Sequence, residues 1–370
     1  SGTLSGEIVV GSGLTMTVGT AATSGQGNIE CMKVYDTFNP PCGGTNGRPA
    51  AAKPGTIYYN KDFKTIEYWD GNFWRQVDNT TRRGRGLVGG GADPANTALI
   101  ESMEMSTEGS SAYFGDRTIS SNNPSACSSA TRGLFCGGGD PAGNNTIDYV
   151  TIASAGNAVD FGDRTSKQFS TGSCGSSTRG LTGGGNPASN IIDYHQFSTL
   201  GDSIDFGDLV SAQYGIASAS SPTRGFWLGG TNDDATMQYV TIASTGNAID
   251  FGNLTAGNRN GRACSNTTRL LKGGGSGTGG GADVIDYITM ASLGNATRFG
   301  DLLSPSTAFS ASFSNQTRGF WCAGRDPANI TLIQKVEIAT TGNAESFGDM
   351  GTARQKVAGL SDSHGGLGGF

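Results

Sequence analysis

The chain has 370 residues and a formal net charge of −6, and 61 of its residues are glycine. It contains no basic run, which argues against nucleic-acid binding, and no stretch approaches the roughly 20 apolar residues of a membrane-spanning helix. The glycine content alone is compatible with disorder, so the order of the residues has to decide whether the chain folds.

The N-terminal part, residues 1–53, is rich in Gly, Ser and Thr and offers too little apolar surface for a core of its own. Its strand candidates are EIVVGS, LTMTVG and IECMKVYD. We expect an attachment arm that becomes ordered by strand pairing with other subunits or with a larger particle. A flexible leader is the alternative. Ser1 opens without the basic and apolar regions of a secretory signal, and a leader cleaved upstream of it stays an open alternative.

From residue 81 to residue 370 the chain repeats one phrase: an arginine-led step into a glycine run, an I-D-Y-type strand, a G-N-A-type turn and F-G-D. The clearest copy, TRGLFCGGGDPAGNNTIDYVTIASAGNAVDFGDR, covers residues 131–164. Copies begin 45–49 residues apart, which suits a four-stranded propeller blade and is too long for a leucine-rich or ankyrin repeat. The leading arginines are Arg85, Arg132, Arg179, Arg224, Arg269 and Arg318, and His364 takes this position in a truncated last copy.

Each copy is predicted to contain four strands, A to D, and almost no α-helix. In the second copy strand A lies at about 123–130, strand B is RGLFCGG, strand C is TIDYVTIAS and strand D is AVDFGDR. The first copy lacks strand A, and a strand at about 354–362 is predicted to complete it and to close six blades. The alternative is seven blades, with residues 65–77 as strands C and D and SHGGLGG as strand B of the seventh.

The order of a glycine doublet, an apolar strand with Tyr, a later aromatic and an arginine-led strand resembles a kelch repeat. The wording TRGLF-GG … IDYVTIASTGNAxDFGDL, ending in SDSHGGLGGF, is similar to the kelch-like repeats of tail-fibre and other structural proteins from marine bacteriophages, cyanophages included. Residues 54–80, with PGTIYYNKDFKTIEYWDGNFWRQV, resemble a β-hairpin module of phage tail proteins. The first, fifth and sixth copies depart from the phrase, which weakens the expectation that every blade binds the same ligand.

The resemblance implies a virion surface protein that contacts other virion proteins through its N-terminal arm. By analogy with fibres it implies a homo-oligomer, with a trimer favoured. The host partner would be a surface glycan or protein, with neither nucleic-acid binding nor membrane insertion.

Histidine is scarce, with only His195 and His364. A kelch-type copper oxidase site resembles a pair of His ligands with tyrosines and a thioether-forming Cys, for which this chain has too few imidazoles. We expect His195, which follows I-D-Y on strand C, to be a half-exposed strand residue. No metal and no cofactor is predicted.

Aspartate recurs at the last position of the F-G-D phrase in five copies, and the fourth copy has asparagine there. Glycosidases use paired carboxylates, but a residue that recurs in every copy is expected to be a fold element, here a turn cap, because a catalytic pair breaks the symmetry. No catalytic residue is predicted. Calcium binding by loop oxygens is the alternative role for acidic and amide residues. The candidates are Asp140, Asn144 and Asn145, or Asp233 and Asp234.

Cysteines occupy two repeat positions. Cys127, Cys174 and Cys264 lie five residues before the arginine, and Cys136 and Cys322 four residues after it. We interpret them as small buried fillers, since equivalent positions on neighbouring blades are too far apart for a disulfide. Within the ring only Cys127 and Cys136 are placed to bridge, and Cys31 and Cys42 form a second candidate pair. Free thiols are favoured, because phage proteins assemble in a reducing cytoplasm.

Recognition is expected to come from loops, which vary while strands hold their shape. The B–C loops are predicted to share one face and the D–A loops, around Arg164, Arg259 and Arg262, the other. Trp227 and Trp321 lie three residues after the arginine; a sugar-stacking platform is one interpretation and packing between blades the other. The candidate ligand-binding residues are Asp93, Asn96, Asp140, Asn186, Asp233, Asp326, Trp227 and Trp321.

The sequence therefore favours a non-enzymatic virion protein, a tail fibre, receptor-binding or capsid-decoration component, that presents a propeller for host attachment. The alternatives are a carbohydrate-active propeller enzyme of the depolymerase kind and a cellular kelch adaptor for protein partners.

Overall fold

The structure is a computed structural model that describes residues 40–61, 65–69, 71, 74–77, 84–139, 143–277, 283–304, 310–326 and 328–368. The chain divides into two compact units, Ser1–Asp78 and Asn79–Phe370. Strands account for 54% and helices for 3% of the structure, which confirms the all-β fold class. No helix within these ranges combines the length and the apolar character needed to cross a bilayer. The three strand candidates of the predicted arm lie outside the described residues.

The first unit holds one sheet in the order β1-β2-β3-β4. Its antiparallel part, β2 (Ile57–Asn60), β3 (Thr65–Trp69) and β4 (Trp74–Val77), is formed by the aromatic segment 54–77. β1 (Cys42–Gly43), which is followed by the 3-10 helix η1 (Thr45–Gly47), pairs with β2 in parallel. Residues 42–43, predicted to belong to the arm, are thus part of this sheet.

The second unit consists mainly of six four-stranded antiparallel sheets, called sheet 1 to sheet 6, each with its strands in the order A to D. Their bounds are as follows: sheet 1, β30 (Ala358–Ser361), β5 (Arg85–Gly89), β6 (Leu99–Glu104) and β7 (Ala112–Asp116); sheet 2, β8 (Ser125–Ser128), β9 (Arg132–Cys136), β10 (Asn144–Thr151) and β11 (Val159–Gln168); sheet 3, β12 (Gly172–Gly175), β13 (Arg179–Gly183), β14 (Ser189–Gln196) and β15 (Ile204–Gln213); sheet 4, β16 (Ala217–Ser220), β17 (Arg224–Gly230), β18 (Asp234–Thr241) and β19 (Ile249–Asn253); sheet 5, β20 (Arg262–Ser265), β21 (Arg269–Gly273), β22 (Val284–Thr289) and β23 (Thr297–Asp301); sheet 6, β24 (Ala311–Ser314), β25 (Arg318–Cys322), β28 (Leu332–Glu337) and β29 (Glu345–Asp349). A two-stranded sheet, β26 (Arg325–Asp326) and β27 (Ala328–Asn329), and the 3-10 helices η3 (Thr231–Asp233) and η4 (Gly365–Leu367) complete the assigned elements.

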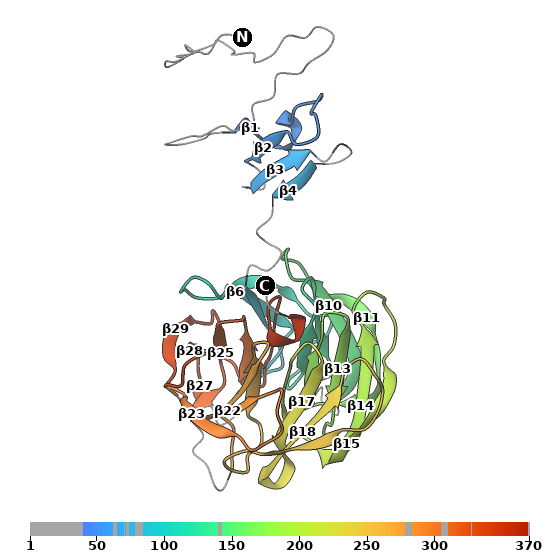
Figure 1. The fold of residues 1–370 in the computed structure, drawn as a ribbon, viewed down its shortest axis with the longest axis vertical. Coiled ribbons are helices and arrows are strands. Elements are labelled where there is room, and N and C mark those ends of the chain that lie inside the picture. Colours follow the sequence, from blue (N-terminus) through green and yellow to red (C-terminus); the bar gives the residue numbers. More distant parts are fainter. Residues whose placement is uncertain are drawn as a thin grey trace, which may run out of the picture. The chain divides into compact units, whose positions relative to one another are not determined.

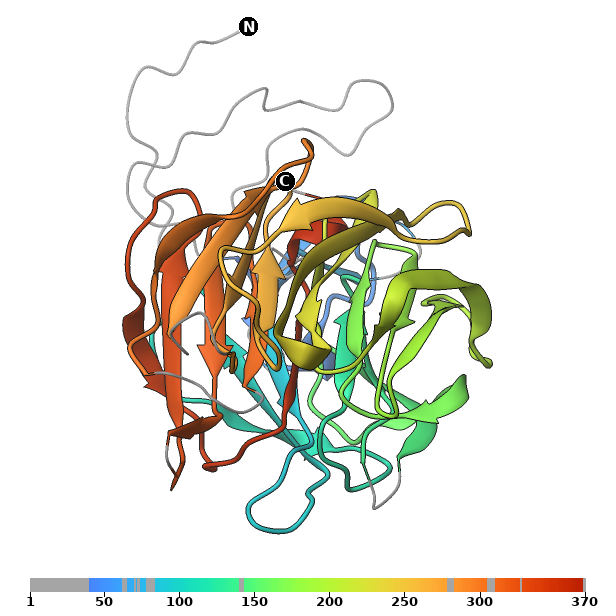
Figure 2. The same cartoon turned by 90° about the horizontal axis from the view of Figure 1, so that it is seen from below.

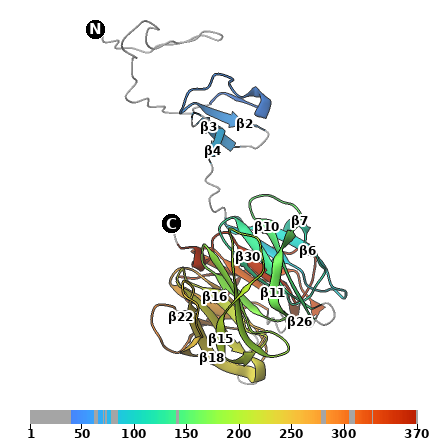
Figure 3. The same cartoon turned by 90° about the vertical axis from the view of Figure 1, so that its right-hand side faces the viewer.

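The six sheets form a propeller-like arrangement. They follow one another around the unit in chain order, as the colours in Figure 1 show, and Figures 2 and 3 give two further views of them. The A strands contact one another in the order β8, β12, β16, β20, β24 and β30, and β30 in turn contacts β8. Apolar side chains pack between neighbouring sheets, as where Leu181 and Phe206 of sheet 3 share a core cluster with Trp227 of sheet 4.

The C-terminal strand completes the first sheet, as the sequence predicted. β30 pairs antiparallel with β5, and Leu360 lies opposite Leu87. The strands required by the seven-blade alternative are formed elsewhere: β3 and β4 belong to the sheet of the first unit, and Gly365–Leu367 form a 3-10 helix. Strand D of the second copy is longer than predicted, because β11 continues to Gln168, which pairs with Asn144 beyond a bulge.

The B–C and D–A connections share one face, called here the loop face, which corrects the prediction that they lie on opposite faces. Isolated bridges join Phe169 of a D–A loop to Asn186 of a B–C loop, and Arg259 to Ser276 in the same way. The reason is strand direction: in a four-stranded antiparallel sheet, alternate connections lie at the same end. The A–B and C–D turns form the opposite, or turn, face.

The repeat arginine ties each sheet to the next one. Arg179 lies over the ring of Tyr194 in its own sheet, 5.0 Å from the centroid. It donates hydrogen bonds to the carbonyls of Ile242 and Ala243 in the C–D turn of sheet 4, at 3.1 and 2.9 Å. The arginines that bond the following sheet in this way also include Arg85, Arg132, Arg224, Arg269 and Arg318.

Candidate functional site

Two of the predicted ligand residues lie in one continuous run of loops. Asp93 is exposed, and its carboxylate accepts a hydrogen bond of 2.8 Å from the Asn329 amide of sheet 6. Asn96 donates to the Gly139 carbonyl at 3.1 Å and accepts from Asn122 at 2.7 Å. The B–C loops of sheets 6, 1 and 2 therefore touch one another on the loop face.

Asn186 and Asp233 lie in the B–C loops of sheets 3 and 4, outside that run. The half-buried Asn186 donates its backbone N–H to the Phe169 carbonyl at 2.8 Å. Asp233 forms an ion pair of 3.7 Å with Arg259. Asp140 and the side chain of Asp326 lie outside the described residues. A ligand role for these residues stays a prediction.

The two tryptophans are packing residues. Trp227 and Trp321 are 0% exposed. Their indole N–H groups donate to the carbonyls of Gly172 at 3.0 Å and Arg262 at 3.2 Å, in the A strands of the preceding sheets. With no exposed ring face, neither offers a sugar-stacking platform, and their place in the list of ligand residues is corrected accordingly.

Two of the calcium candidates, Asn144 and Asp234, make side-chain hydrogen bonds to protein atoms. The buried Asn144 amide donates to the Gly138 carbonyl at 3.0 Å. The Asp234 carboxylate accepts from Gln213 at 2.8 Å and from the Thr236 hydroxyl at 2.8 Å. Within the described ranges, the one group of His, Cys, Asp and Glu side chains with metal-ligand spacing lies elsewhere, in the core.

The axis of the six sheets is narrow and is covered by the C-terminal turn. Two cavities of about 50 Å³ each lie between the A strands and are lined largely by serine, alanine and glycine. Serine hydroxyls link neighbouring A strands, as where Ser361 Oγ donates to the Ser314 carbonyl at 2.6 Å. The bonds of the same kind at this level come from Ser128, Ser220, Ser265 and Ser314.

His364 completes this ring of hydrogen bonds where the sequence interrupts it. Sheet 3 has Gly175 at the serine position, so no hydroxyl reaches the Ser128 carbonyl. His364 Nε2 lies 2.9 Å from that carbonyl, while its Nδ1 accepts from the Gly366 N–H at 3.1 Å. Nε2 therefore carries the proton, and the η4 turn is fixed over the end of the axis.

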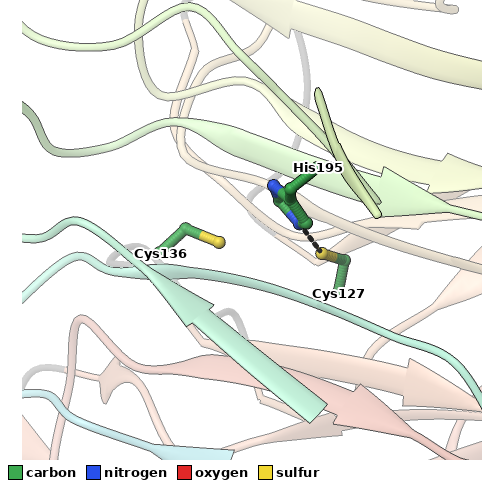
Figure 4. A group of neighbouring side chains, drawn as sticks. All are labelled: Cys127, Cys136 and His195. Carbon is green, nitrogen blue, oxygen red and sulfur yellow. Dashed lines mark hydrogen bonds between the residues drawn. The ribbon is translucent and has the colours of Figure 1, made fainter. Parts of the chain in front are cut away.

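A second group of side chains, Cys127, Cys136 and His195, lies between sheets 2 and 3 (Figure 4). Their two Sγ atoms and one imidazole nitrogen all lie within 4.8 Å of one another. Cys127 Sγ and His195 Nε2 are 3.5 Å apart. His195 is 3% exposed, which corrects the expectation of a half-exposed residue. Its side chain faces inward to the core between the sheets rather than the solvent.

Burial and hydrogen bonding set the protonation of this group. Desolvation lowers the pKa of His195 to about 4, with a further contribution from Arg164. Interaction with the neighbouring Cys136, aided by burial, raises the pKa of Cys127. Interaction with Cys127 lowers the pKa of Cys136 against the opposing effect of burial, and the nearby Arg164 lowers it further. Near neutral pH the imidazole is therefore neutral, and Cys136 is the thiol closer to ionisation.

The two cysteines are free thiols in this arrangement. In the β8–β9 pairing Cys127 lies opposite Leu134 and Cys136 opposite Ser125, so the two cysteines are diagonal neighbours. Diagonal positions lie about 7–8 Å apart, beyond the Cα separation that suits a disulfide.

The sequence contained a signal for this group, namely two departures from the repeat at positions that are otherwise apolar or glycine. His195 stands where the other sheets have an apolar residue, and Cys136 where most have glycine. The equivalents of His195 are Met103, Val150, Val240, Ile288 and Val336, and those of Cys136 are Gly89, Gly183, Leu228, Gly273 and Cys322. Neither departure identifies a site alone; only the packing of sheet 2 against sheet 3 brings them together.

No protein-family model and no curated protein matches this chain.

Proposed function

We propose that the protein is a non-enzymatic binding protein of a virion, built as a six-bladed, kelch-like propeller that presents its loop face to a host surface. The observation that carries the binding role is the use of the repeated polar residues. The repeat arginines, and the aspartates of the I-D-Y phrase such as Asp148 and Asp193, are engaged in contacts between sheets. They hold the fold and leave recognition to the variable loops.

The six-blade assignment is supported by the six four-stranded sheets and by the pairing of β30 with β5. The contact between β30 and β8 supports closure of the ring. In this closure the first and last strands of the propeller pair in one sheet, which suits a propeller because β5 is not left as an unpaired edge.

The axial cavities are too small to serve as a small-molecule active site. A cavity of about 50 Å³ is well below the roughly 300–1,000 Å³ of a small-molecule site. The aspartates of the F-G-D phrase lie on the D strands of different sheets. Their backbone N–H groups donate to asparagine side chains of the next sheet, as from Asp116 to Asn157 at 3.1 Å and from Asp208 to Asn247 at 3.1 Å.

The virion role rests on the resemblance of the repeat phrase and of residues 54–80 to phage structural proteins. In this proposal the arm, residues 1–53, attaches the protein to other virion proteins. A homotrimer displays three loop faces, and multiple copies raise the avidity of individually weak contacts with a surface glycan or protein.

Locating the protein on purified particles tests the virion role. Antibodies against the propeller are expected to label intact particles, at the tail if the protein binds the receptor and on the capsid if it decorates it. Particles without the protein, or its recovery only from uninfected cells in complex with a cellular partner, would contradict the proposal.

A competition assay tests the loop face. Purified protein is expected to reduce adsorption of particles to host cells, and Asp93→Lys is expected to weaken this effect. Ala155→Lys, an exposed position in a C–D turn, is the matched control on the turn face. Equal loss with both variants contradicts recognition by the loop face. Release of reducing ends from host polysaccharide, abolished by replacing one carboxylate pair, contradicts the non-enzymatic assignment.

A further inference from the structure

We propose that Cys127 Sγ, Cys136 Sγ and His195 Nε2 form a binding site for one soft, three-coordinate metal ion, and that the ion is Cu(I). This site is separate from the loop face and does not depend on the proposed virion role. Its three donors come from β8 and β9 of sheet 2 and from β14 of sheet 3. A bound ion would therefore cross-link two neighbouring sheets.

The spacing of the donors suits one ion. Thiolate and imidazole donors lie about 2.0–2.3 Å from a bound metal, so three of them around one ion are roughly 3.5–4 Å apart. Cys127 Sγ and His195 Nε2 are already 3.5 Å apart, and all three donors lie within 4.8 Å of one another. Movements of about 1 Å, which side-chain rotation supplies, complete the set.

The surroundings select a soft ion of low coordination number. The core cluster around the thiols contains Ile147, Phe161 and Phe197, and the rings of both phenylalanines lie 5.9 Å from the His195 ring. No carboxylate among the described residues joins the group. Thiolates favour Cu(I) and Zn(II), whereas Mg²⁺, Ca²⁺ and Mn²⁺ prefer oxygen. Structural zinc is almost always four-coordinate, and a three-donor group enclosed by aromatic and aliphatic side chains suits Cu(I) better.

Neighbouring groups contact the imidazole and favour the thiolate form of Cys136. Ser203 Oγ lies 3.5 Å from His195 Nδ1 and can accept a hydrogen bond from it; in that tautomer the Nε2 lone pair points toward Cys127. The Arg164 and Arg117 guanidiniums lie close enough to Cys136 to favour its thiolate. With Cu(I), the two thiolates carry a net charge of −1, and the nearby Arg117 and Arg164 form ion pairs with Asp148 and Asp193.

Sheets 3 and 5 also have a cysteine at the position of Cys127, but the residue it contacts in the next sheet is valine instead of histidine. The complete set of donors is therefore not a product of the repeat. Cys174 meets Val240, and Cys264 meets Val336, where Cys127 meets His195. Cys136 has room because its neighbour in sheet 3 is the small Thr182. In sheet 4 the position of Thr182 is taken by Trp227, and the ring of Trp227 fills the space beside Gly183. All three donors thus converge between sheets 2 and 3 and at no other described contact between sheets.

The repeat itself supplies variants that keep the fold. His195→Val places the residue of sheets 2, 4 and 6 at this position, Cys136→Gly the residue of sheets 1, 3 and 5, and Cys127→Ala the residue of sheet 4. Cys174→Ala is the matched control, a buried thiol at the position of Cys127 that has valine in place of the imidazole partner. All proteins carry Cys31→Ser and Cys42→Ser, so that thiols of the first unit do not contribute.

The experiment is an anaerobic titration with Cu(I) buffered by a chromophoric chelator, on native protein and on protein refolded with the ion present because the donors are buried. We expect one Cu(I) per chain, and at least a 100-fold weaker affinity for each of the three donor variants. Cys174→Ala is expected to bind like the parent. X-ray absorption is expected to report two sulfurs and one nitrogen. Circular dichroism and thermal melting establish that each variant is folded.

Three results would overturn the proposal. The first is Cu(I) uptake that is absent in both preparations or unchanged in the donor variants. The second is equal loss with Cys174→Ala. The third is a Zn(II) site of higher affinity than the Cu(I) site, with a fourth donor in its spectrum. The adsorption assay with His195→Val separates this site from the proposed attachment role, because the variant is expected to compete for host cells as the parent does.

Discussion

The glycine of the F-G-D phrase packs so closely against the next sheet that an added methyl group would clash with its backbone. A Cβ at Gly115 would lie 2.1 Å from the Gly156 carbonyl oxygen in the C–D turn of sheet 2. Gly115→Ala is expected to lower the free energy of unfolding by about 1–3 kcal/mol, because the backbone of the turn has to move. Gly156→Ala is the matched control, since nothing lies within 4 Å of its added Cβ. Thermal melts compare the two, and equal shifts would contradict the close-contact explanation.

A buried lysine makes a second residue-scale prediction. Lys272 occupies the position of Trp227 and Trp321, is 4% exposed, and donates to the Gly274 carbonyl at 2.7 Å. Burial lowers its pKa from 10.5 to about 7, although Asp286 opposes the shift. Between these values the unfolded chain keeps a proton that the folded protein releases, so stability rises with pH through this window and is lost as pH falls toward 7.

Lys272→Met removes that dependence. The variant is expected to be more stable than the parent by roughly 2–4 kcal/mol at pH 7. The difference is expected to shrink by about 1.4 kcal/mol per pH unit toward pH 10. Urea unfolding at several pH values measures it, with the exposed Lys167→Met as the control for loss of one charge. A parent whose stability relative to the variant is flat across this range would contradict the buried-charge explanation.

At the scale of elements, the joints between sheets use interchangeable residue pairs. Arg164 of β11 donates to Asp193 of β14 at 3.0 Å, and both side chains are at most 1% exposed. At the next joint the same positions are Leu209 and Gln238, where Gln238 accepts the Val210 N–H at 2.7 Å. A buried ion pair and a leucine with an amide thus hold equivalent interfaces.

Exchanging one joint for the other tests this equivalence. Arg164→Leu alone is expected to cost about 3–5 kcal/mol, because it leaves Asp193 buried without its partner. Arg164→Leu with Asp193→Gln recreates the Leu209–Gln238 pair and is expected to recover stability to within about 1 kcal/mol of the parent. Chemical denaturation of the single and double variants measures the coupling. A double variant as unstable as the single one would show that the joints are not interchangeable.

For the whole molecule, the decisive contact is between β30 and β5, residues that lie more than 250 positions apart in the chain. Deletion of residues 357–370 removes β30, so β5, β8 and β24 each lose one of their neighbouring strands. We expect that chain not to unfold cooperatively. Deletion of residues 364–370 removes only His364 and the η4 turn, so the fold is expected to persist with a lower melting temperature. Circular dichroism and limited proteolysis compare the two, and a cooperative melt without β30 would contradict closure by this strand.

The repeat made much of the architecture predictable. Its period and its apolar strands indicated four strands per copy, and the missing first strand of copy one indicated that the C-terminal strand would pair with Arg85–Gly89, as β30 does. The D–A loops were predicted on the wrong face, although strand alternation places them on the face of the B–C loops. The exposure of His195 was also wrong, because alternation along one strand does not reveal that its inward side meets the thiols of another sheet.

The sequence by itself therefore determined the unit and its succession: four strands, glycines at close approaches, and a last strand left over for the first sheet. These features follow from the local spacing of residues, which recurs in six copies of the repeat. The tertiary structure decided which of the residues that depart from the repeat come into contact with one another. Cys127, Cys136 and His195 converge, and Trp227 and Trp321 are enclosed, because neighbouring sheets bring together residues whose separation in the chain carries no information about contact.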